Sequence, residues 1–280
     1  MKILITGAKG LLGGYLVDFF KNSYSVFAFG RKDLDITDFK SLKNKIAEIK
    51  PDILINCAAY TDVDGAEKNF KEAFRVNGFG VRNLAILSRD YDFHLIHFST
   101  NYVFKGDKNR LYNEFDIVSP VNTYGESKLA GELEIEKFSN NYSIIRISWL
   151  YGNGGNSFPV KILKKAEKER FINVVNDIYC SPTSVRMVAE TVNFVIRNGI
   201  KGILHCSCEG FCTLYEYALI LKDIFKFPSK ILPISSKKFS FVARRPNFSV
   251  LESIVFRDYG YTFRNFREEL ISFYRDYGKV

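Results

Sequence analysis

The sequence has few cysteines and no long apolar run, and both absences narrow the class of protein. Its 280 residues include five cysteines, an odd and unevenly spaced set that does not suit a disulfide framework. His205, Cys206, Cys208 and Cys212 lie close together without a C-x-x-C pair, so we predict small buried side chains rather than a metal site. No stretch approaches the roughly 20 apolar residues of a membrane helix, and Ile3–Ile5 is too short for a signal peptide. We therefore expect a cytoplasmic protein that makes no membrane contact.

The chain also lacks an arginine-rich arm and an aromatic RNA-binding signature, although its formal net charge is +9. Lysines and arginines are spread along the whole sequence. A basic balance of this kind favours anionic small molecules, and nucleotides with a pyrophosphate suit it as well as nucleic acid does. We predict a small-molecule partner and no nucleic acid. Hydrophobic residues make up 46% and charged residues 25%, which is ordinary for a packed protein.

Short apolar runs alternate with amphipathic segments in the first half of the chain. This rhythm is typical of a parallel sheet with helices on both faces, an α/β fold of the doubly wound Rossmann type. The predicted strands are Ile3–Thr6, Ser25–Phe29, Asp52–Cys57, Phe93–Ser99 and Ile144–Ser148. The predicted helices are Leu11–Phe20, Asp38–Ile49, segments within Ala66–Leu87, and Lys128–Phe138.

The rhythm changes after Tyr151, where a glycine-rich loop begins. We predict a dinucleotide-binding domain over residues 1–151 and a smaller, mainly substrate-binding lobe over residues 152–280. Residues 184–207 are candidates to return to the main sheet. Helices are expected at Pro159–Glu169, Ser184–Arg197, Leu214–Phe225 and Phe263–Tyr274, with a basic loop at Lys230–Arg245.

Gly7, Gly10 and Gly13 form a G-x-x-G-x-x-G sequence between the first predicted strand and helix. Glycines allow a tight turn and a close approach of the backbone to a pyrophosphate, and the helix N terminus offers N–H donors to it. A plain strand-to-helix turn is the alternative. The position directly after the first strand favours a dinucleotide cofactor.

The residues at the end of the second strand distinguish NAD-binding from NADP-binding proteins. An acidic residue there binds the ribose hydroxyls of NAD, whereas a basic residue suits the 2′-phosphate of NADP. Here the strand ends in Phe29-Gly30-Arg31-Lys32. The basic residue Arg31 therefore favours NADPH as the cofactor. NADH stays an alternative, since Asp33 or Asp35 could reach an adenosine and Arg31 could be a solvated turn residue.

Tyr124 and Lys128 form a Y-x-x-x-K sequence, which places both side chains on one face of a helix. A phenol ordinarily has a pKa of about 10, and a nearby ammonium lowers it toward the range of a useful acid. The pair predicts a tyrosine that protonates a carbonyl oxygen, with lysine tuning it. Ser99 and Thr100 follow the fourth strand, and we predict that Thr100 joins the catalytic set by orienting the carbonyl.

Together these residues resemble an extended short-chain dehydrogenase/reductase, and within that group the dTDP-4-dehydrorhamnose reductase family. The resemblance covers nearly the whole chain. The matching segments are Gly7–Gly13, Asn56–Asp64, Ser99–Phe104, Ser119–Glu132, Arg146–Gly152, Ser181–Thr183 and Arg245–Leu251. The resemblance implies NAD(P)H-dependent reduction of the 4-keto group of dTDP-4-dehydro-L-rhamnose to dTDP-L-rhamnose, a precursor of cell-surface polysaccharides.

The resemblance also implies roles for individual residues. The cofactor-binding residues are Gly10, Leu11 and Leu12 at the pyrophosphate, Asp35 and Ile36 near the adenine, and Ala58, Ala59 and Thr61 at the end of the third strand. Tyr124 becomes the proton donor, and Lys128 also binds the nicotinamide ribose. Thr100, Asn101 and Trp149 contact the sugar. Arg245 is a candidate partner of the substrate pyrophosphate by its charge and its bidentate fork, with a structural role as the alternative.

Three positions depart from the family pattern. Asn101 stands where Asp is usual, so a charge near the sugar is missing, and Cys180 replaces a usual glycine. Tyr15 occupies the place of a glutamate through which some members bind magnesium and dimerise, so no metal is predicted. A homodimer is compatible with the resemblance.

Two other functions compete with the reductase. Epimerases of the same superfamily share the tyrosine and lysine, whereas dehydratases tend to have acidic residues where Asn101-Tyr102 stand. A regulatory subunit of methionine adenosyltransferase also resembles these reductases and binds cofactor without needing turnover. The complete set of Thr100, Tyr124 and Lys128 favours an enzyme.

Overall fold

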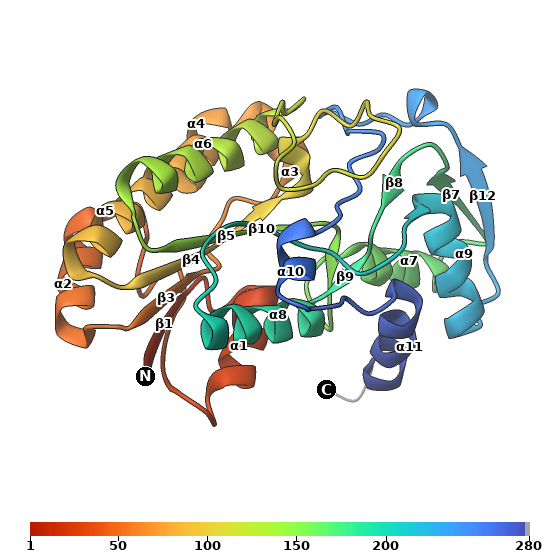
Figure 1. Ribbon diagram of the computed structural model, residues 1–280. Helices are drawn as coiled ribbons and strands as arrows, with labels where there is room; N and C mark the ends of the chain where they lie inside the picture. Colours follow the sequence, from red (N-terminus) through yellow and green to blue (C-terminus); the bar gives the residue numbers. More distant parts are fainter. Residues whose placement is uncertain (278–280) are drawn as a thin grey trace.

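Six parallel strands form the centre of the molecule in the computed structural model, which describes residues 1–277. Their order across the sheet is β10-β5-β4-β3-β1-β2 (Figure 1). The strands are β1 (Lys2–Thr6), β2 (Ser25–Phe29), β3 (Ile53–Asn56), β4 (His94–Thr100), β5 (Tyr142–Ile147) and β10 (Gly202–Cys206). The order reverses direction at β1 and β3, and ligands of such sheets bind at the carboxyl ends of the strands near that point.

Apolar runs rather than alternating patterns build these strands, because helices cover both faces of the sheet. Ile3, Leu4 and Ile5 of β1 are all fully buried, with Ile3 and Ile5 facing one core and Leu4 the other. The predicted α/β fold with a doubly wound parallel sheet is therefore confirmed.

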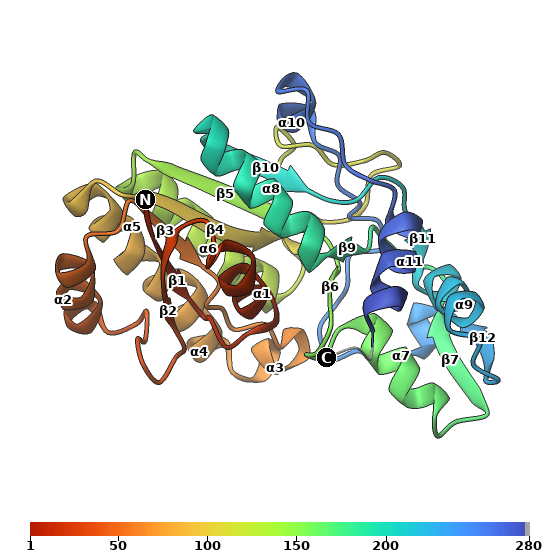
Figure 2. The same ribbon diagram turned by 90° about the horizontal axis from the view of Figure 1, so that it is seen from below.

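Two layers of helices enclose the sheet. On one face α1 (Leu11–Phe20) packs beside α8 (Val185–Asn198), and Figure 2 shows both from below. On the other face lie α2 (Phe39–Ile49), α5 (Val81–Tyr91) and α6 (Thr123–Phe138). The chain reaches α5 through α3 (Val63–Lys68), α4 (Phe70–Phe74) and a π-helical turn, Arg75–Gly80.

A second core lies beyond the carboxyl ends of the strands. Its principal elements are α7 (Phe158–Ala166), β7 (Phe171–Val175), α9 (Leu214–Phe225), β12 (Lys230–Ile234) and α11 (Phe266–Asp276). The predicted loop Lys230–Arg245 is wrong at its start, because β12 pairs in parallel with β7, a strand that the sequence did not indicate. The lysine-rich composition hid an apolar stretch whose partner lies about sixty residues earlier in the chain.

The short elements join the two parts. Three of them precede α8: β6 (Leu150–Tyr151), β8 (Tyr179–Cys180) and β9 (Thr183–Ser184). The chain then returns through α8 to β10, which pairs with β5 at the edge of the large sheet. The chain then passes through β11 (Cys212–Thr213) into the lobe, and α10 (Ile254–Asp258) packs near β10.

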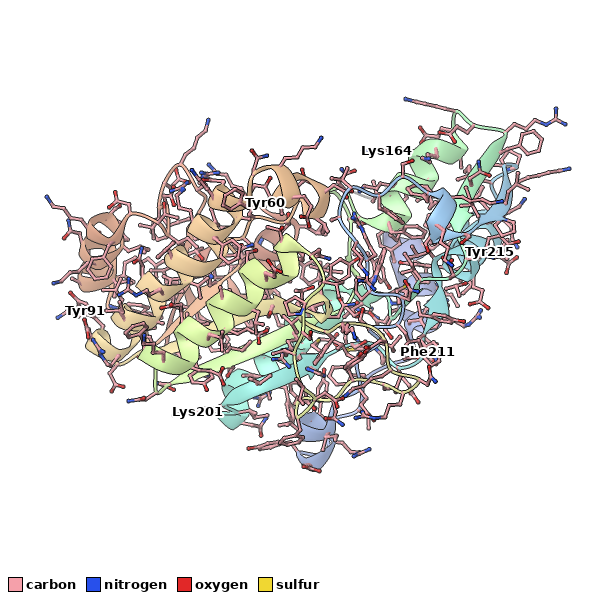
Figure 3. The ribbon with its side chains drawn as sticks, turned by 90° about the horizontal axis from the view of Figure 1, so that it is seen from above. Tyr60, Tyr91, Lys164, Lys201, Phe211 and Tyr215 are labelled. Atoms are coloured by element: carbon pink, nitrogen blue, oxygen red, sulfur yellow. The ribbon has the colours of Figure 1, made fainter. Side chains whose placement is uncertain are left out.

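The two ends of the sheet are easily told apart in Figure 3. Tyr91 and Lys201, which precede β4 and β10, lie at the side away from the lobe. Tyr60, which follows β3, lies at the side that faces the lobe, where Phe211 and Tyr215 are labelled. The carboxyl ends of the strands therefore face the second core.

Candidate active site

The turn between β1 and α1 is built for close approach. Gly7 has φ of +64°, and a Cβ there would lie 2.5 Å from the backbone nitrogen of Ala58. A Cβ on Gly13 would lie 2.3 Å from the carbonyl oxygen of Gly7. Helix α1 begins after Gly10 without a side-chain cap and without an acidic residue in its first turn. The N–H groups and the positive end of the helix dipole are thus directed at this turn, an arrangement that fits an anionic pyrophosphate.

Arg31, at the end of β2, lies in a cluster of charges. Its guanidinium donates to Glu72 at 2.9 Å and is 3.8 Å from a carboxylate oxygen of Asp35. Arg75 also binds Glu72, at 2.7 Å, and with Arg31 it holds the pKa of that carboxyl at about 2. A hollow of about 320 Å³ opens beside Glu72, and its lining includes the cations Lys68, Lys71 and Arg75. Arg31 is 66% exposed and stands next to this basic surface.

The other residues predicted to border the cofactor lie nearby. Asp35 accepts hydrogen bonds from the backbone and side chain of Thr37, and Ile36 is buried. Ala58 and Ala59 are half-buried after β3, while Thr61 is exposed. Leu12 of α1 is buried against the sheet, and Leu11 is half-buried.

Tyr124 and Lys128 belong to the first turns of α6, a helix that starts five residues earlier than predicted. Asn122 caps it by accepting a hydrogen bond from the backbone nitrogen of Gly125. A Cβ on Gly125 would lie 2.3 Å from the carbonyl oxygen of Tyr102, so glycine lets the start of α6 approach the end of β4. The helix thereby brings its tyrosine and lysine to the carboxyl ends of the strands.

The phenol of Tyr124 lies beside the side chain of Thr100, and its ring meets that of Tyr102 edge-on at 6.1 Å. Burial raises the pKa of the phenol to about 12, and the neighbouring Thr100 side chain opposes that shift. In this geometry burial, and not Lys128, sets the direction of the shift in the pKa of Tyr124, so the tuning role of Lys128 stays a prediction. The amine of Lys128 instead turns toward the backbone of β4.

Lys128 is 2% exposed. Its Nζ donates to the carbonyl oxygen of Phe98 at 2.6 Å and is 3.3 Å from Nε2 of His97. Burial lowers the pKa of the ammonium to about 8, while the carboxylate of Glu132 acts in the opposite direction. His97 is fully buried and carries no motif signal of its own, so sequence reasoning did not single it out.

Thr100 and Asn101 join β4 to the segment after β12. The Oγ1 of Thr100 accepts from the backbone nitrogen of Tyr102 and is 3.4 Å from Oδ1 of Asn101. Asn101 is buried, and its amide donates to Ser249 at the hydroxyl (2.7 Å) and the carbonyl oxygen (3.2 Å). An aspartate could not make the second bond because it has no N–H. Asparagine at this position therefore suits the local contact with Ser249.

Trp149 and Arg245 come from the two sides of the lobe. Trp149 follows β5 with a positive φ of +46°, and its ring meets Phe158 edge-on at 6.1 Å. Arg245 binds Asp64 at the start of α3 through two nitrogens, at 2.6 and 2.8 Å. This bidentate pair holds the pKa of Asp64 below its usual range. Asp64 lies in a segment that the resemblance had marked, although its partner could not be read from the sequence.

The clustered residues His205, Cys206, Cys208 and Cys212 are all buried. Both ring nitrogens of His205 have hydrogen-bond partners. Nε2 contacts the guanidinium of Arg146, and Nδ1 contacts the carbonyl oxygens of Tyr112 and Glu252. Cys206 is buried in the core of the large sheet, and Cys208 and Cys212 belong to that of the lobe. Across residues 1–277, no three His, Cys, Asp or Glu side chains are grouped to hold a metal. No helix in the same range is long and apolar enough to cross a membrane.

Comparison with known proteins places this geometry among sugar-nucleotide enzymes. Residues 1–278 match the model of a family described as the RmlD substrate binding domain. The spore coat polysaccharide biosynthesis protein SpsK of Bacillus subtilis (strain 168) is 36% identical over 96% of this chain and 95% of its own. The dTDP-4-keto-6-deoxy-D-glucose reductase of Streptomyces niveus is 34% identical over 92% and 91%.

A solved structure agrees over almost every residue. It is described as dTDP-4-dehydrorhamnose reductase from Bacillus anthracis str. Ames in complex with NADP. The TM-score is 0.96 at 36% identity, and the match covers 98% of this chain and 99% of that one. The strand order and the lobe described above are therefore shared with a protein that binds a dinucleotide.

Proposed function

The chain belongs to the RmlD substrate-binding domain family, and from this membership we propose that it is an NADPH-dependent reductase of a dTDP-4-dehydro-6-deoxy sugar. The substrate that we propose first is dTDP-4-dehydro-L-rhamnose, and the product is dTDP-L-rhamnose, used to build cell-surface polysaccharide. We place the reaction in the cytoplasm. Residues 1–151 bind the cofactor in this proposal, and the lobe within residues 152–280 binds most of the sugar nucleotide.

The observation behind the proposal is that the phenol of Tyr124 lies beside the side chain of Thr100, with Lys128 one helical turn away on α6. NADPH, when bound, supplies the hydride that reduces the ketone carbon. Tyr124 donates its phenolic proton to the ketone oxygen, and its raised pKa ensures that the proton is present at neutral pH. Thr100 orients the same oxygen with its hydroxyl. Lys128, as an ammonium, favours the phenolate that forms and binds the ribose.

The residues at the strand ends fit a phosphorylated dinucleotide. The uncapped N terminus of α1 suits the pyrophosphate, with Gly7, Gly10 and Gly13 leaving room for it. Arg31 and the cations beside Glu72 suit a 2′-phosphate. The residues that we assign to the adenosine and to the β3 end are Asp35, Ile36, Ala58, Ala59 and Thr61, and those at the first turn of α1 are Leu11 and Leu12.

The substrate side offers fewer polar groups. Ser99 and Ser148, at the carboxyl ends of β4 and β5, have buried hydroxyls that bond to no other described residue. Both hydroxyls are closed off from solvent in this geometry, so we assign them no contact with the substrate. We assign Trp149 to the face of the sugar and Arg245 to the nucleotide side, where it can exchange part of its bond with Asp64 for a phosphate oxygen. Asn101 positions Thr100 and supports the substrate through it.

A second substrate has specific support. The relative from Streptomyces niveus is named for dTDP-4-keto-6-deoxy-D-glucose, which differs from the rhamnose precursor in its stereochemistry at carbons 3 and 5. Its identity of 34% is close to that of the dTDP-4-dehydrorhamnose reductase structure. Both sugars present a 4-keto group to the same tyrosine, so the choice between them depends on the lobe.

The test is direct. The purified protein is mixed with NADPH and, separately, with each of these two 4-keto sugar nucleotides, and the loss of NADPH absorbance is followed while products are identified by NMR. We expect stoichiometric NADPH loss with one alcohol product. A changed sugar without NADPH loss would indicate an epimerase instead. No turnover, together with capture of a methionine adenosyltransferase catalytic subunit, would favour a regulatory subunit.

Cofactor preference gives a separate prediction. We expect kcat/KM for NADPH to exceed that for NADH by on the order of tenfold, because Arg31 can form charge-assisted bonds with a 2′-phosphate. Arg31→Met should remove most of that preference by weakening NADPH alone. Lys21→Met, which removes the same charge from the far end of α1, is the control and should leave the ratio unchanged. A wild-type preference for NADH would contradict the assignment.

A further inference from the structure

A row of buried polar side chains crosses the sheet beneath the candidate site and ends at Lys128. Thr6 of β1, Asn56 of β3 and His97 of β4 are register partners on adjacent strands, and each is at most 1% exposed. Thr6 Oγ1 donates to Asn56 Oδ1 at 2.7 Å, and the amide of Asn56 lies 2.9 Å from Nδ1 of His97. Nε2 of His97 lies 3.3 Å from Nζ of Lys128.

The row fixes which nitrogen of His97 holds the proton. The backbone nitrogen of Ala58 can only donate, and it donates to Asn56 Oδ1 at 3.1 Å. This contact orients the amide so that its NH₂ group faces the imidazole, and Nδ1 of His97 must accept. Burial lowers the pKa of His97 well below its ordinary value, so the ring is neutral. A neutral ring that accepts at Nδ1 has its proton on Nε2, the atom that faces Lys128.

This tautomer has a consequence for the lysine. The N–H at Nε2 is a donor, and an ammonium offers only donors, so the two groups repel when Lys128 is charged. The 3.3 Å contact becomes a hydrogen bond only when Nζ has a lone pair, while another N–H of the amine still donates to the carbonyl oxygen of Phe98. The buried contact therefore favours the neutral amine.

We propose that His97, held as the Nε2–H tautomer by Asn56, is a positioning residue that sets the pH at which Lys128 loses its proton. The link to catalysis rests on the proposed function, in which the ammonium form of Lys128 is the active one. Loss of that proton then defines the alkaline limit of activity. Thr6 and Asn56 contribute through His97 and need not touch a ligand.

The other groups around Lys128 do not account for this effect. Glu132, one turn along α6, favours the ammonium, although Arg146 binds its carboxylate through two nitrogens. Cys57 is a thiol whose pKa is raised by burial, so it is neutral. The phenol of Tyr124 is also neutral because burial raises its pKa to about 12. Apart from burial itself, His97 is the contact that opposes the charge on Lys128.

Imidazole nitrogen shifts test the tautomer without any assay of activity. The chain has three histidines, so ¹⁵N-histidine labelling gives three ring systems, and His97→Asn identifies the one in question. We expect Nδ1 unprotonated and Nε2 protonated from acid to alkaline pH, with an Nε2 shift that titrates at a midpoint near 8 as Lys128 titrates. Lys128→Met should abolish that titration. A proton on Nδ1, a charged ring, or a titration that survives in Lys128→Met would overturn the proposal.

The pH profile of kcat/KM tests the consequence. His97→Asn keeps an acceptor for the amide of Asn56 but cannot reach Lys128, so the alkaline limb should move upward by about one pH unit. His94→Asn is the matched control, because His94 lies on the same strand and bonds to Ser143 instead. Its limb should not move. An unmoved limb in a folded His97→Asn enzyme would overturn the proposal, and if this variant does not fold, the shifts of the wild type and Lys128→Met decide.

The two proposals can fail separately. If no ketone is reduced while the Nε2 shift still follows Lys128, the reductase assignment is wrong and the tautomer stands. If the ketone is reduced normally and the shift shows a proton on Nδ1, the reductase stands and the role of His97 is wrong.

Discussion

Replacing Tyr124 with phenylalanine is expected to lower kcat by about 10²- to 10⁴-fold, the usual contribution of a positioned acid. The substitution removes the hydroxyl beside Thr100 and leaves the ring, so the edge-on contact with Tyr102 remains. Binding of NADPH should change little, because the glycine turn and Arg31 are untouched. Steady-state rates with the active keto sugar and the fluorescence of bound NADPH measure the two effects.

Tyr142→Phe provides the control for loss of a tyrosine hydroxyl. Tyr142 is half-buried at the start of β5, at the opposite end of the strands from Thr100. Its variant should keep wild-type kcat and cofactor affinity. If Tyr124→Phe also kept wild-type kcat, the proton donor would have to be another group, and the assignment of α6 to catalysis would fail.

The local patterns that predicted the fold are those with a short-range physical cause. Gly13 was readable because a Cβ there meets the backbone of Gly7 and Ala8 a few residues earlier, whereas a Cβ on Gly7 would meet the backbone of Cys57 and Ala58, which lies about fifty residues further along the chain. Buried strands such as β1 were readable because the sheet is covered on both faces. The start of α6 was placed too late, since Asn122 signals a cap only when the turn of chain before it is known.

What escaped prediction depends on pairs far apart in the chain. β7 and β12 pair within the lobe although about sixty residues separate them in the chain. Arg245 binds Asp64, which lies 181 residues earlier. The row from Thr6 to His97 exists only because three strands share one register, which no single strand encodes. The direction of the pKa shift at Tyr124 also required the structure, because burial outweighs a charge that points elsewhere.

Some motif residues are structural rather than chemical. Glu132 and Arg146 both lie in segments that the family resemblance marked, yet neither touches Tyr124 in the described contacts. Arg146 of β5 binds Glu132 of α6 through Nε at 3.0 Å and a terminal nitrogen at 2.7 Å, and both side chains are at most 3% exposed. The guanidinium lies 5.2 Å from the ring centre of Phe104 and bonds to His205. This pair fastens α6 to the sheet.

Arg146→Met is expected to lower the free energy of unfolding by about 3–5 kcal/mol, because it leaves the carboxylate of Glu132 buried without a partner. The size of the loss reflects the cost of an uncompensated charge more than the strength of the ion pair. Urea denaturation followed by circular dichroism measures it, with the change read from the midpoint at constant slope. A loss below about 1 kcal/mol would mean that water reaches the pair and screens it.

The double variant Arg146→Met/Glu132→Leu separates these two causes. Removing both charges replaces the pair by apolar groups of similar volume, and such replacements are often neutral or stabilising. We therefore expect the double variant to recover most of the stability that the single variant loses. If the double variant were as unstable as Arg146→Met, the bonds to His205 and the contact with Phe104 would be the main contribution of Arg146. Recovery would instead locate the cost in the unpaired Glu132, one turn from Lys128 on the helix that both residues share.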